Sequence, residues 1–175
     1  KDKHLWADSF QRDLKDVLAL QGEVARAIAQ EVRAKLTPEE ATHLAASRQV
    51  DPEAYEAYLQ GRYFYDRRSK KDLEKAIGYF EQALRIDPNF ARAWVGLSDT
   101  HSRQADRGYI PVNESYANAR QEADKALELD STLAEAHSAI GWIKTFHDWD
   151  WTGADAAYKK ALELEPANAD IVRRS

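Results

Sequence analysis

Three segments of the sequence align with one another without gaps, and this internal repeat restricts the possible folds more than any other feature. The segments are AIGYFEQALRIDP (76–88), ARQEADKALELDS (119–131) and ADAAYKKALELEP (154–166). Ala83, Ala126 and Ala161 occupy the same position in the three segments, at spacings of 43 and 35 residues. Self-similarity at a period of about 20–50 residues is typical of proteins that stack one supersecondary unit on the next. The repeat therefore predicts a stacked array.

Each repeat predicts an Ala-rich amphipathic helix, a short turn containing Pro or Ser, and a second helix that opens on Ala. The segments after the first two turns also match, as ARAWVGLSDTH (91–101) and AEAHSAIGWIK (134–144). Small side chains recur where two helices must approach closely, and larger ones such as Phe80 and Tyr158 fill the gaps between them. Pro88 and Pro166 mark the ends of the preceding helices, because proline cannot extend a helix. We therefore expect an all-α fold.

This pattern resembles the tetratricopeptide repeat (TPR), a helix–turn–helix unit of about 34 residues. The resemblance covers roughly residues 52–175 and implies a right-handed superhelical stack of about three helix pairs, with a fourth unit beginning at ANADIV. The first spacing is about nine residues longer than the typical unit, so we expect a loop in or near residues 105–115. About three additional residues are also expected around YDRRSKK (65–71).

Residues 1–36 follow a different pattern. The run KDKHLWADSFQRD alternates polar and apolar side chains, which suits one β-strand. The next segment predicts a helix with an apolar stripe formed by Val17, Leu20, Val24, Ile28 and Val32. Thr37-Pro-Glu-Glu40 is a capping-box start for a short helix. Because a lone strand cannot persist without a sheet, we predict that 1–36 are the C-terminal remnant of a truncated α/β domain, 37–50 a linking helix, and 51–175 the repeats.

The amino-terminal segment resembles the end of the TolB-like domain that precedes TPR arrays in bacterial regulators. The run HLWADSFQRDLKDVLALQGEVARAIAQEV carries this resemblance, followed by LTPEE and DPEAYEAYLQGRYFYDRRS. The resemblance implies a piece of a longer chain with an output domain upstream, either an adenylate or guanylate cyclase domain or a winged-helix DNA-binding domain. It does not distinguish between these two output domains.

Composition and charge exclude several classes of function. Hydrophobic residues make up 43% of the chain, which is enough to form a core, so wholesale disorder is not expected. The 25 basic and 30 acidic residues are interspersed, whereas a nucleic-acid interface needs clustered Lys and Arg. No apolar run approaches the roughly 18 residues of a membrane span, so we expect no membrane insertion. The sequence does not fix the compartment; we expect the cytoplasm, with the periplasm as the alternative if the parent chain carries a transmembrane helix.

The sequence contains no motif for catalysis or cofactor binding. Cysteine is absent, no Gly-x-Ser-x-Gly motif occurs, and the seven glycines are scattered singly, unlike those of a phosphate-binding loop. We therefore predict that this part of the chain is not an enzyme and holds no cofactor and no metal, whatever output domain its parent carries.

The motif FHDWDWTGA (146–154) allows two interpretations. His147, Asp148 and Asp150 offer three possible metal ligands, but a zinc site needs three or four that converge. We favour a turn between two helices, in which Asp150 is the N-cap and Trp151 is a packing residue. Asp148 would favour the positive end of the helix. Trp149 stands where the repeat usually has a small turn residue, and the pattern does not explain it.

The first helix of each unit is expected to line a concave groove. Helical spacing places thirteen side chains on this stripe: Tyr55, Tyr58, Arg62, Tyr65, Arg92, Val95, Asp99, Ser102, Arg103, Glu135, Ser138, Trp142 and Thr145. Tyr, Arg and Trp are the usual hot-spot residues of protein interfaces. The predicted partner-binding residues are therefore Tyr55, Tyr58, Arg62, Tyr65, Arg92, Asp99, Arg103 and Trp142. The alternative is that some of the tyrosines are buried against Pro111 and the long loop.

We expect the partner to be a protein or peptide with a mixed apolar and acidic surface, including the parent's own output domain. The alternative function is a sensory module that binds a peptide or small ligand in the groove and controls an attached cyclase or DNA-binding domain. The groove lacks the Lys and Asn set with which TPR proteins hold the acidic tail of chaperones, so that partner is not expected. The apolar stripe of 1–36 predicts docking on the first repeat or a homodimer.

Overall fold

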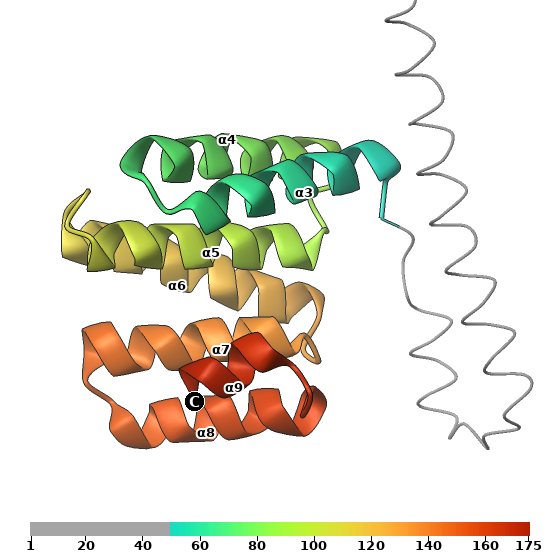
Figure 1. Ribbon diagram of the computed structural model, residues 1–175. Coiled ribbons are helices and arrows are strands. Elements are labelled where there is room, and N and C mark those ends of the chain that lie inside the picture. The colour runs from blue at the N-terminus through green and yellow to red at the C-terminus, as the bar shows by residue number, and fades with distance from the viewer. Residues whose placement is uncertain (1–49) are drawn as a thin grey trace, which may run out of the picture. The chain divides into compact units, whose positions relative to one another are not determined.

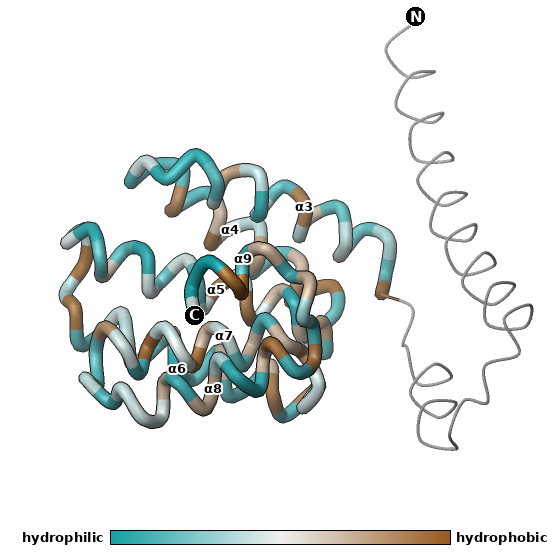
Figure 2. The backbone as a smooth tube through the Cα atoms, turned by 60° about the horizontal axis from the view of Figure 1, so that its bottom comes forward, coloured by the Kyte–Doolittle hydropathy of each residue, from teal (hydrophilic) through white to brown (hydrophobic). Residues whose placement is uncertain are grey.

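The structure, a computed structural model, describes residues 50–175, and these residues form stacked helix pairs (Figure 1). The three pairs are α3 (Pro52–Arg67) with α4 (Lys70–Ile86), α5 (Ala91–Asp106) with α6 (Val112–Leu129), and α7 (Ala134–Ile143) with α8 (Trp151–Leu164). A π-helical segment, η1 (Lys144–Asp148), extends α7, and α9 (Ala169–Arg174) begins a fourth unit. The predicted all-α repeat is confirmed. Apolar and polar residues alternate along each helix, as amphipathic helices require (Figure 2).

The predictions for the amino-terminal segment fall outside the described residues. They are the strand, the apolar stripe, the helix that starts after Thr37, and the assignment of 1–36 and 37–50 to an α/β remnant and a linking helix.

The turns between units are stabilised by aspartate side chains at the ends of the second helices. Asp87 follows α4, and its carboxylate accepts a hydrogen bond from the backbone N–H of Asn89 at 3.1 Å. Asp130 follows α6 and accepts from the backbone N–H of Thr132 at 2.9 Å. Asp side chains favour turns because they can bond to the backbone two residues further on. These local contacts explain why consecutive units join through short turns.

The additional residues of the second unit mostly lengthen its helices. The connection between α5 and α6 comprises only residues 107–111, which lie inside the predicted loop 105–115. At Gly108 the backbone has a φ of 66°, in the left-handed region that glycine adopts readily.

Across the long α5–α6 pair, His101 and Glu122 lie 2.9 Å apart (Nδ1 to Oε2). Burial raises the pKa of Glu122, and the hydrogen bond with His101 acts against that increase.

The core contains a large ring that sits between two glycines. Phe80 of α4 is fully buried. A Cβ atom added at Gly61 of α3 would lie 2.5 Å from a carbon of its ring, and one added at Gly96 of α5 would lie 2.6 Å away. The third unit repeats the arrangement, because a Cβ atom at Gly141 would lie 2.8 Å from the ring of Tyr158. The glycines allow the first helices to pack directly onto these rings.

The turn FHDWDWTGA confirms one prediction and corrects another. Asp150 is the N-cap of α8, since its Oδ1 accepts from the Gly153 N–H at 2.9 Å. The prediction that Trp151 is a packing residue is wrong. Its side chain is 61% exposed and contacts Trp149 edge-on, because the buried stripe of α8 begins only at Ala154.

Asp148 was expected to interact with the positive end of α8, and in the structure its carboxylate makes specific hydrogen bonds. Its carboxylate accepts hydrogen bonds from Arg120 of α6 and from His147, at 3.0 Å in the second case. Burial would raise the pKa of Asp148, but these two hydrogen bonds outweigh it and lower the pKa. Asp148 therefore ties the turn to α6, the second helix of the preceding unit.

Trp149 has a conformation that explains why the repeat usually places a small residue there. Its backbone is left-handed, with φ 58° and ψ 26°, and it ends η1. The following N–H, that of Asp150, donates to the Lys144 carbonyl at 3.0 Å, which closes the helix end. Glycine or asparagine is the usual residue at such a position. The Trp149 side chain is 70% exposed, so it gains little packing in return.

Replacing Trp149 with glycine should therefore stabilise the protein. Left-handed backbone costs an L-residue about 1 kcal/mol relative to glycine. The Trp149→Ala variant is the control, because it also removes the indole but keeps the unfavourable backbone. In urea titrations Trp149→Gly should unfold at a higher midpoint than Trp149→Ala. Equal midpoints would show that the turn conformation carries no cost.

Candidate partner-binding groove

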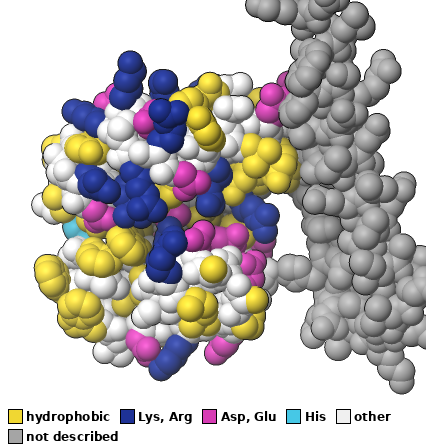
Figure 3. Space-filling view, in the orientation of Figure 1, with side chains coloured by type: hydrophobic (Ala, Val, Ile, Leu, Met, Phe, Trp, Pro, Cys, Tyr) yellow, Lys and Arg dark blue, Asp and Glu magenta, His cyan; other side chains and the backbone are white. Residues whose placement is uncertain are grey.

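The first helices of successive units line a groove of about 240 Å³. Arg62, Asp99 and Trp142 stand at equivalent positions of α3, α5 and α7, so their side chains emerge on the same face of the stack. Lysine and arginine side chains gather there with aspartates and glutamates across the middle of the face (Figure 3). The groove is therefore polar and charged, with aromatic side chains among the charges.

Tyr55 and Tyr58 belong to the packing between the first two units. Both are half-buried, and their ring centroids lie 6.4 and 5.1 Å from that of Phe90. The ring of Tyr58 also lies 5.9 Å from that of Phe80. Burial raises the pKa of Tyr58, against the effect of Arg62 and Arg92. The alternative of structural tyrosines thus describes these two, although their neighbours are aromatic residues of the repeats rather than Pro111.

Among the predicted arginines, Arg62 and Arg92 make the weakest contacts with other residues of the protein. Arg92 is exposed and lies 3.9 Å from a carboxylate oxygen of Glu135, a distance at the limit of an ion pair. Arg62 is half-buried, lies near the hydroxyl of Tyr58 and lines the groove. Both guanidiniums can take an acidic group of a partner without breaking a strong contact.

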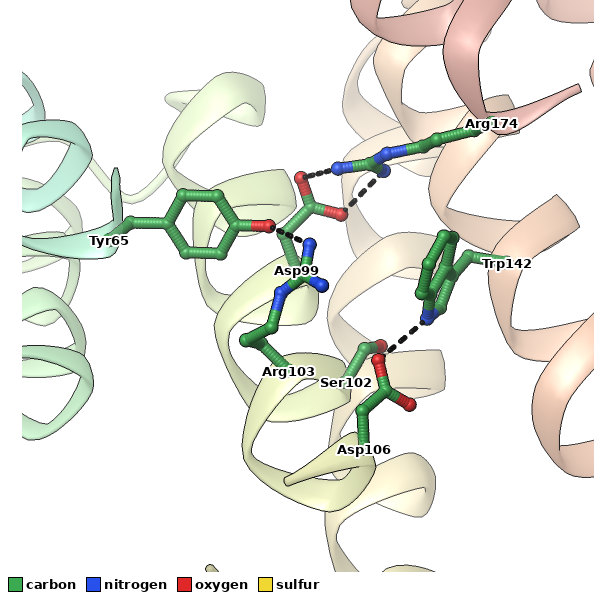
Figure 4. A pocket seen from close by; sticks show the side chains of 7 residues that line it. All are labelled: Tyr65, Asp99, Ser102, Arg103, Asp106, Trp142 and Arg174. Atoms are coloured by element: carbon green, nitrogen blue, oxygen red, sulfur yellow. Dashed lines mark hydrogen bonds and ion pairs between the residues drawn. The ribbon is translucent and has the colours of Figure 1, made fainter. Parts of the chain in front are cut away.

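Tyr65, Arg103 and Trp142 form one cluster in the groove (Figure 4). The Arg103 guanidinium carbon lies 5.9 Å from the Tyr65 ring centroid and 5.5 Å from that of Trp142. Arg103 also donates to the Tyr65 hydroxyl at 3.3 Å, and the Trp142 Nε1–H donates to Asp106 at 3.2 Å. Tyr65 is buried, and burial raises its pKa. The structure thus brings these predicted residues together, but their side chains already contact one another and are not free for a partner.

The sequence reasoning missed a central residue of the groove, Arg174 of α9. Its two terminal nitrogens donate to the two carboxylate oxygens of Asp99, both at 2.9 Å (Figure 4). Its guanidinium carbon lies 5.7 Å from the Trp142 ring centroid. The charge of Asp99 raises the pKa of Arg174, against the opposing effect of burial.

Helical spacing gave no signal for Arg174. Alignment of the fourth unit on the second places it at the position of Gly96, which faces a neighbouring helix, and places Arg173 in the groove. Arg173 does line the groove and pairs with Asp170 of its own helix. Arg174 reaches the groove as well because its side chain is long.

Within residues 50–175, no group of three or more His, Cys, Asp or Glu side chains is placed to hold a metal ion. The alternative metal site at the FHDWDWTGA turn uses its carboxylates otherwise, since Asp148 contacts Arg120 and Asp150 contacts Lys144 and Gly153. None of the helices described in this part of the chain is long and apolar enough to cross a membrane.

Comparisons of sequence identify related proteins. The sequence model of the tetratricopeptide repeat family matches residues 67–90. A protein of Rhizobium meliloti (strain 1021) named "Putative adenylate cyclase 3" is 30% identical over 148 residues, which is 81% of this chain and 25% of that protein. "Transcriptional regulator HilA" of Salmonella typhimurium is 26% identical over 114 residues, 65% of this chain and 20% of the regulator. The chain thus spans about a quarter or less of the length of these relatives.

Comparisons of structure identify the fold. The TPR domain of Arabidopsis OM64 superposes with a TM-score of 0.54 and 18% identity, over 69% of this chain and 89% of that domain. The first TPR of Spaghetti (RPAP3), solved with the HSP90 peptide SRMEEVD, gives a TM-score of 0.55 and 19% identity, over 69% of this chain and 88% of the other. The repeated helix pairs, the family match over residues 67–90 and these neighbours agree: residues 50–175 have the fold of tetratricopeptide repeats.

Proposed function

We propose that residues 50–175 bind a segment of a partner protein in the groove lined by α3, α5, α7 and α9. The observation that carries this proposal is the convergence of arginine and aromatic side chains from four successive first helices on one groove. Aromatic and guanidinium groups dominate the energy of protein interfaces. A segment that crosses the successive helices can contact several of these groups at once.

The charges of the groove favour a partner segment of mixed character. Arg62 and Arg92 are available for acidic side chains, while Glu135 and Asp170 line the same face. A purely acidic segment would meet these carboxylates, and like charges at an interface are costly. The TPR of Spaghetti (RPAP3) was solved with the acidic peptide SRMEEVD. We expect that peptide not to bind here, because this groove lacks the Lys and Asn set expected for it.

The proposed setting is a multidomain bacterial signalling protein, in which these repeats are not catalytic. Support comes from the names of two relatives, an adenylate cyclase and a transcriptional regulator, which are both much longer than this chain. A cyclase or DNA-binding output domain on the same polypeptide would be present at high effective concentration. The parent's own output domain is therefore the first partner to test.

The alternative, a small-molecule sensor, is less well supported by the groove. Its volume of about 240 Å³ is below the roughly 300–1,000 Å³ of typical ligand pockets. The groove is also lined by many charged side chains, whereas such pockets are mostly apolar. Both features favour an extended polypeptide segment.

Binding of the output domain, produced as a separate protein, should weaken about tenfold for each of Arg62→Ala and Arg92→Ala in isothermal titration calorimetry. A tenfold change corresponds to about 1.4 kcal/mol, a typical loss at an interface hot spot. Arg85→Ala is the matched control, because Arg85 is exposed on α4, a second helix outside the groove. It should bind like the wild type, and all three variants should keep the wild-type melting midpoint.

Two results would contradict the proposal. Equal weakening by Arg85→Ala would show that the partner does not select the groove. A fall in melting midpoint without selective loss of binding would show that these arginines are structural. Arg103 and Trp142 are unsuitable as first tests, because their contacts with each other and with Tyr65 and Asp106 make loss of stability an expected result.

A further inference from the structure

The Asp99 carboxylate is paired with the guanidinium of Arg174, and only another planar cation could make the same two hydrogen bonds. Arg174 donates two parallel hydrogen bonds to its two oxygens, both at 2.9 Å, and each side chain is only 15% exposed. Two-on-two pairing of this kind is specific to a guanidinium, because an ammonium group is a point charge without the planar fork. Both side chains line the groove, so the same position is within reach of a bound segment.

The groups around the Arg174 guanidinium belong to α5 and α7, and they keep their positions without α9. Trp142 presents its ring to Arg174 at 5.7 Å and to Arg103 at 5.5 Å, both within the range of cation–π attraction. Its Nε1–H donates to Asp106 of α5, which fixes the ring. Asp99 itself is part of α5, one of the helices of the central unit. A carboxylate and an aromatic face are therefore preorganised for a guanidinium whether or not Arg174 is present.

The helix that carries Arg174 contacts the rest of the described chain through few side chains. In α9, Ile171 is the one fully buried side chain, and it packs against Ala134 and Ala161. The Asp170–Arg173 pair joins two residues of the same helix and does not fix α9 to the rest of the protein. The long Arg174 side chain can turn away from Asp99 while Ile171 stays packed, and this would leave the carboxylate without its strongest partner.

We propose that Asp99 and Trp142 form a guanidinium-binding site, that Arg174 is its internal occupant, and that an arginine side chain of the partner segment exchanges with Arg174. This inference rests on the proposed function and specifies one side chain of the partner. The exchange replaces one guanidinium with another, so the Asp99 charge stays paired and the net electrostatic cost is small. A lysine cannot restore both hydrogen bonds, and an acidic side chain is repelled.

The exchange also couples partner binding to α9. A partner arginine in the site requires Arg174 to leave it, and the departure of Arg174 removes the ion pair between α9 and α5. A ligand that binds one of two conformations better shifts the population toward that conformation. Binding of the partner would thus break the ion pair between α9 and α5, and a more stable Asp99–Arg174 pair would weaken binding of the partner.

The test uses Arg174→Ala in the full chain and N-acetyl-arginine amide as the probe. The melting midpoint of this variant should rise with probe concentration, because a ligand that binds only the folded state stabilises it. The dissociation constant should be at least tenfold lower than for the wild type, in which Arg174 competes. N-acetyl-lysine amide should have little effect. Arg173→Ala, which changes the neighbouring arginine, should respond like the wild type, and Asp99→Asn/Arg174→Ala should lose the response.

A second variant covers the case in which Arg174→Ala does not fold. Arg174→Lys keeps a cation beside Asp99 without the planar fork, and it too should bind the arginine probe more tightly than the wild type. Equal effects of the arginine and lysine probes, or no effect of the arginine probe on either variant, would overturn the guanidinium site. No partner protein enters this experiment. Failure here together with intact, Arg62-dependent binding of the output domain would reject the guanidinium site and leave the proposed function standing.

Discussion

Gly96→Ala should be among the most destabilising single-methyl additions to this protein. The added Cβ would lie 2.6 Å from a ring carbon of Phe80, closer than real atoms approach. The ring is fully buried and has little room to move, because a Cβ position at Gly61 lies 2.5 Å from the same ring carbon. Overpacking of a tight core typically costs about 1–3 kcal/mol, and a fully buried ring in close contact with two helices places this change near the upper end. In thermal unfolding the midpoint should fall by roughly 6–10 °C.

Gly78→Ala is the matched control for this prediction. Gly78 lies in the middle of α4, and a Cβ atom there would have no neighbour within 4 Å. Alanine is favoured over glycine in a helix by about 0.5–1 kcal/mol, so this variant should gain stability. The same substitution is thus expected to act in opposite directions in neighbouring helices.

A compensating change tests the proposed cause. Phe80→Leu removes part of the ring and should be destabilising by itself, because it leaves unfilled space in the core. In that background Gly96→Ala should cost much less, since the methyl group then occupies part of the space. If Gly96→Ala is harmless in the wild type, or equally harmful in both backgrounds, the ring contact does not control the packing of α4 on α5.

The sequence predicted the repeat because its pattern is local and recurs. Ala83, Ala126 and Ala161 are all fully buried, as their shared position predicted, and Asp150 caps α8 as its place before Trp151 and Ala154 predicted. Such features depend on short-range geometry that is the same in each unit. They could therefore be read from spacing without knowledge of the other helices.

The exceptions depend on contacts that spacing does not encode. Trp151 occupies a repeat position that suggests packing, yet it is exposed, because exposure depends on whether another side chain lies opposite. Gly61 and Gly96 appeared only as isolated glycines until Phe80 was found between them. Arg174 stands at a position occupied by glycine in the second unit, and the length of its side chain brings it into the groove.

In the groove, too, spacing predicted the positions of the side chains but not their contacts with one another. Spacing placed Arg62, Asp99 and Trp142 at equivalent positions, and the structure has all three line the groove. Spacing could not indicate that Arg174 would neutralise Asp99 or that Arg103 would lie against the ring of Trp142. Pairing decides which groups remain available to a partner. The predicted stripe is thus a list of positions, and the pairs within it determine its chemistry.

Breaking the Asp99–Arg174 pair should be the most costly change of charge in the described part of the chain. Both side chains are largely buried, and removing one partner of a buried pair leaves a charge without compensation. Because the pair retains some exposure, we expect Arg174→Met to lower the free energy of unfolding by about 2–3 kcal/mol, rather than the 3–5 kcal/mol of full burial. Asp99→Leu should cost less, because the long Arg174 side chain can turn toward water whereas Asp99 is fixed on α5.

The double variant Asp99→Leu/Arg174→Met separates the pair from its surroundings. With both charges gone, its stability should return to within about 1 kcal/mol of the wild type, since apolar side chains of similar volume often replace a buried pair at little cost. Arg173→Met is the control, because its pair with Asp170 is exposed, at 68% and 58%, and exposed pairs contribute little. Urea titrations of the five proteins give all four differences. If Arg173→Met and Arg174→Met cost the same, or the double variant is as unstable as the sum of the single variants, the charges of Asp99 and Arg174 do not act as a pair. The position would then be an unsuitable receptor for a guanidinium.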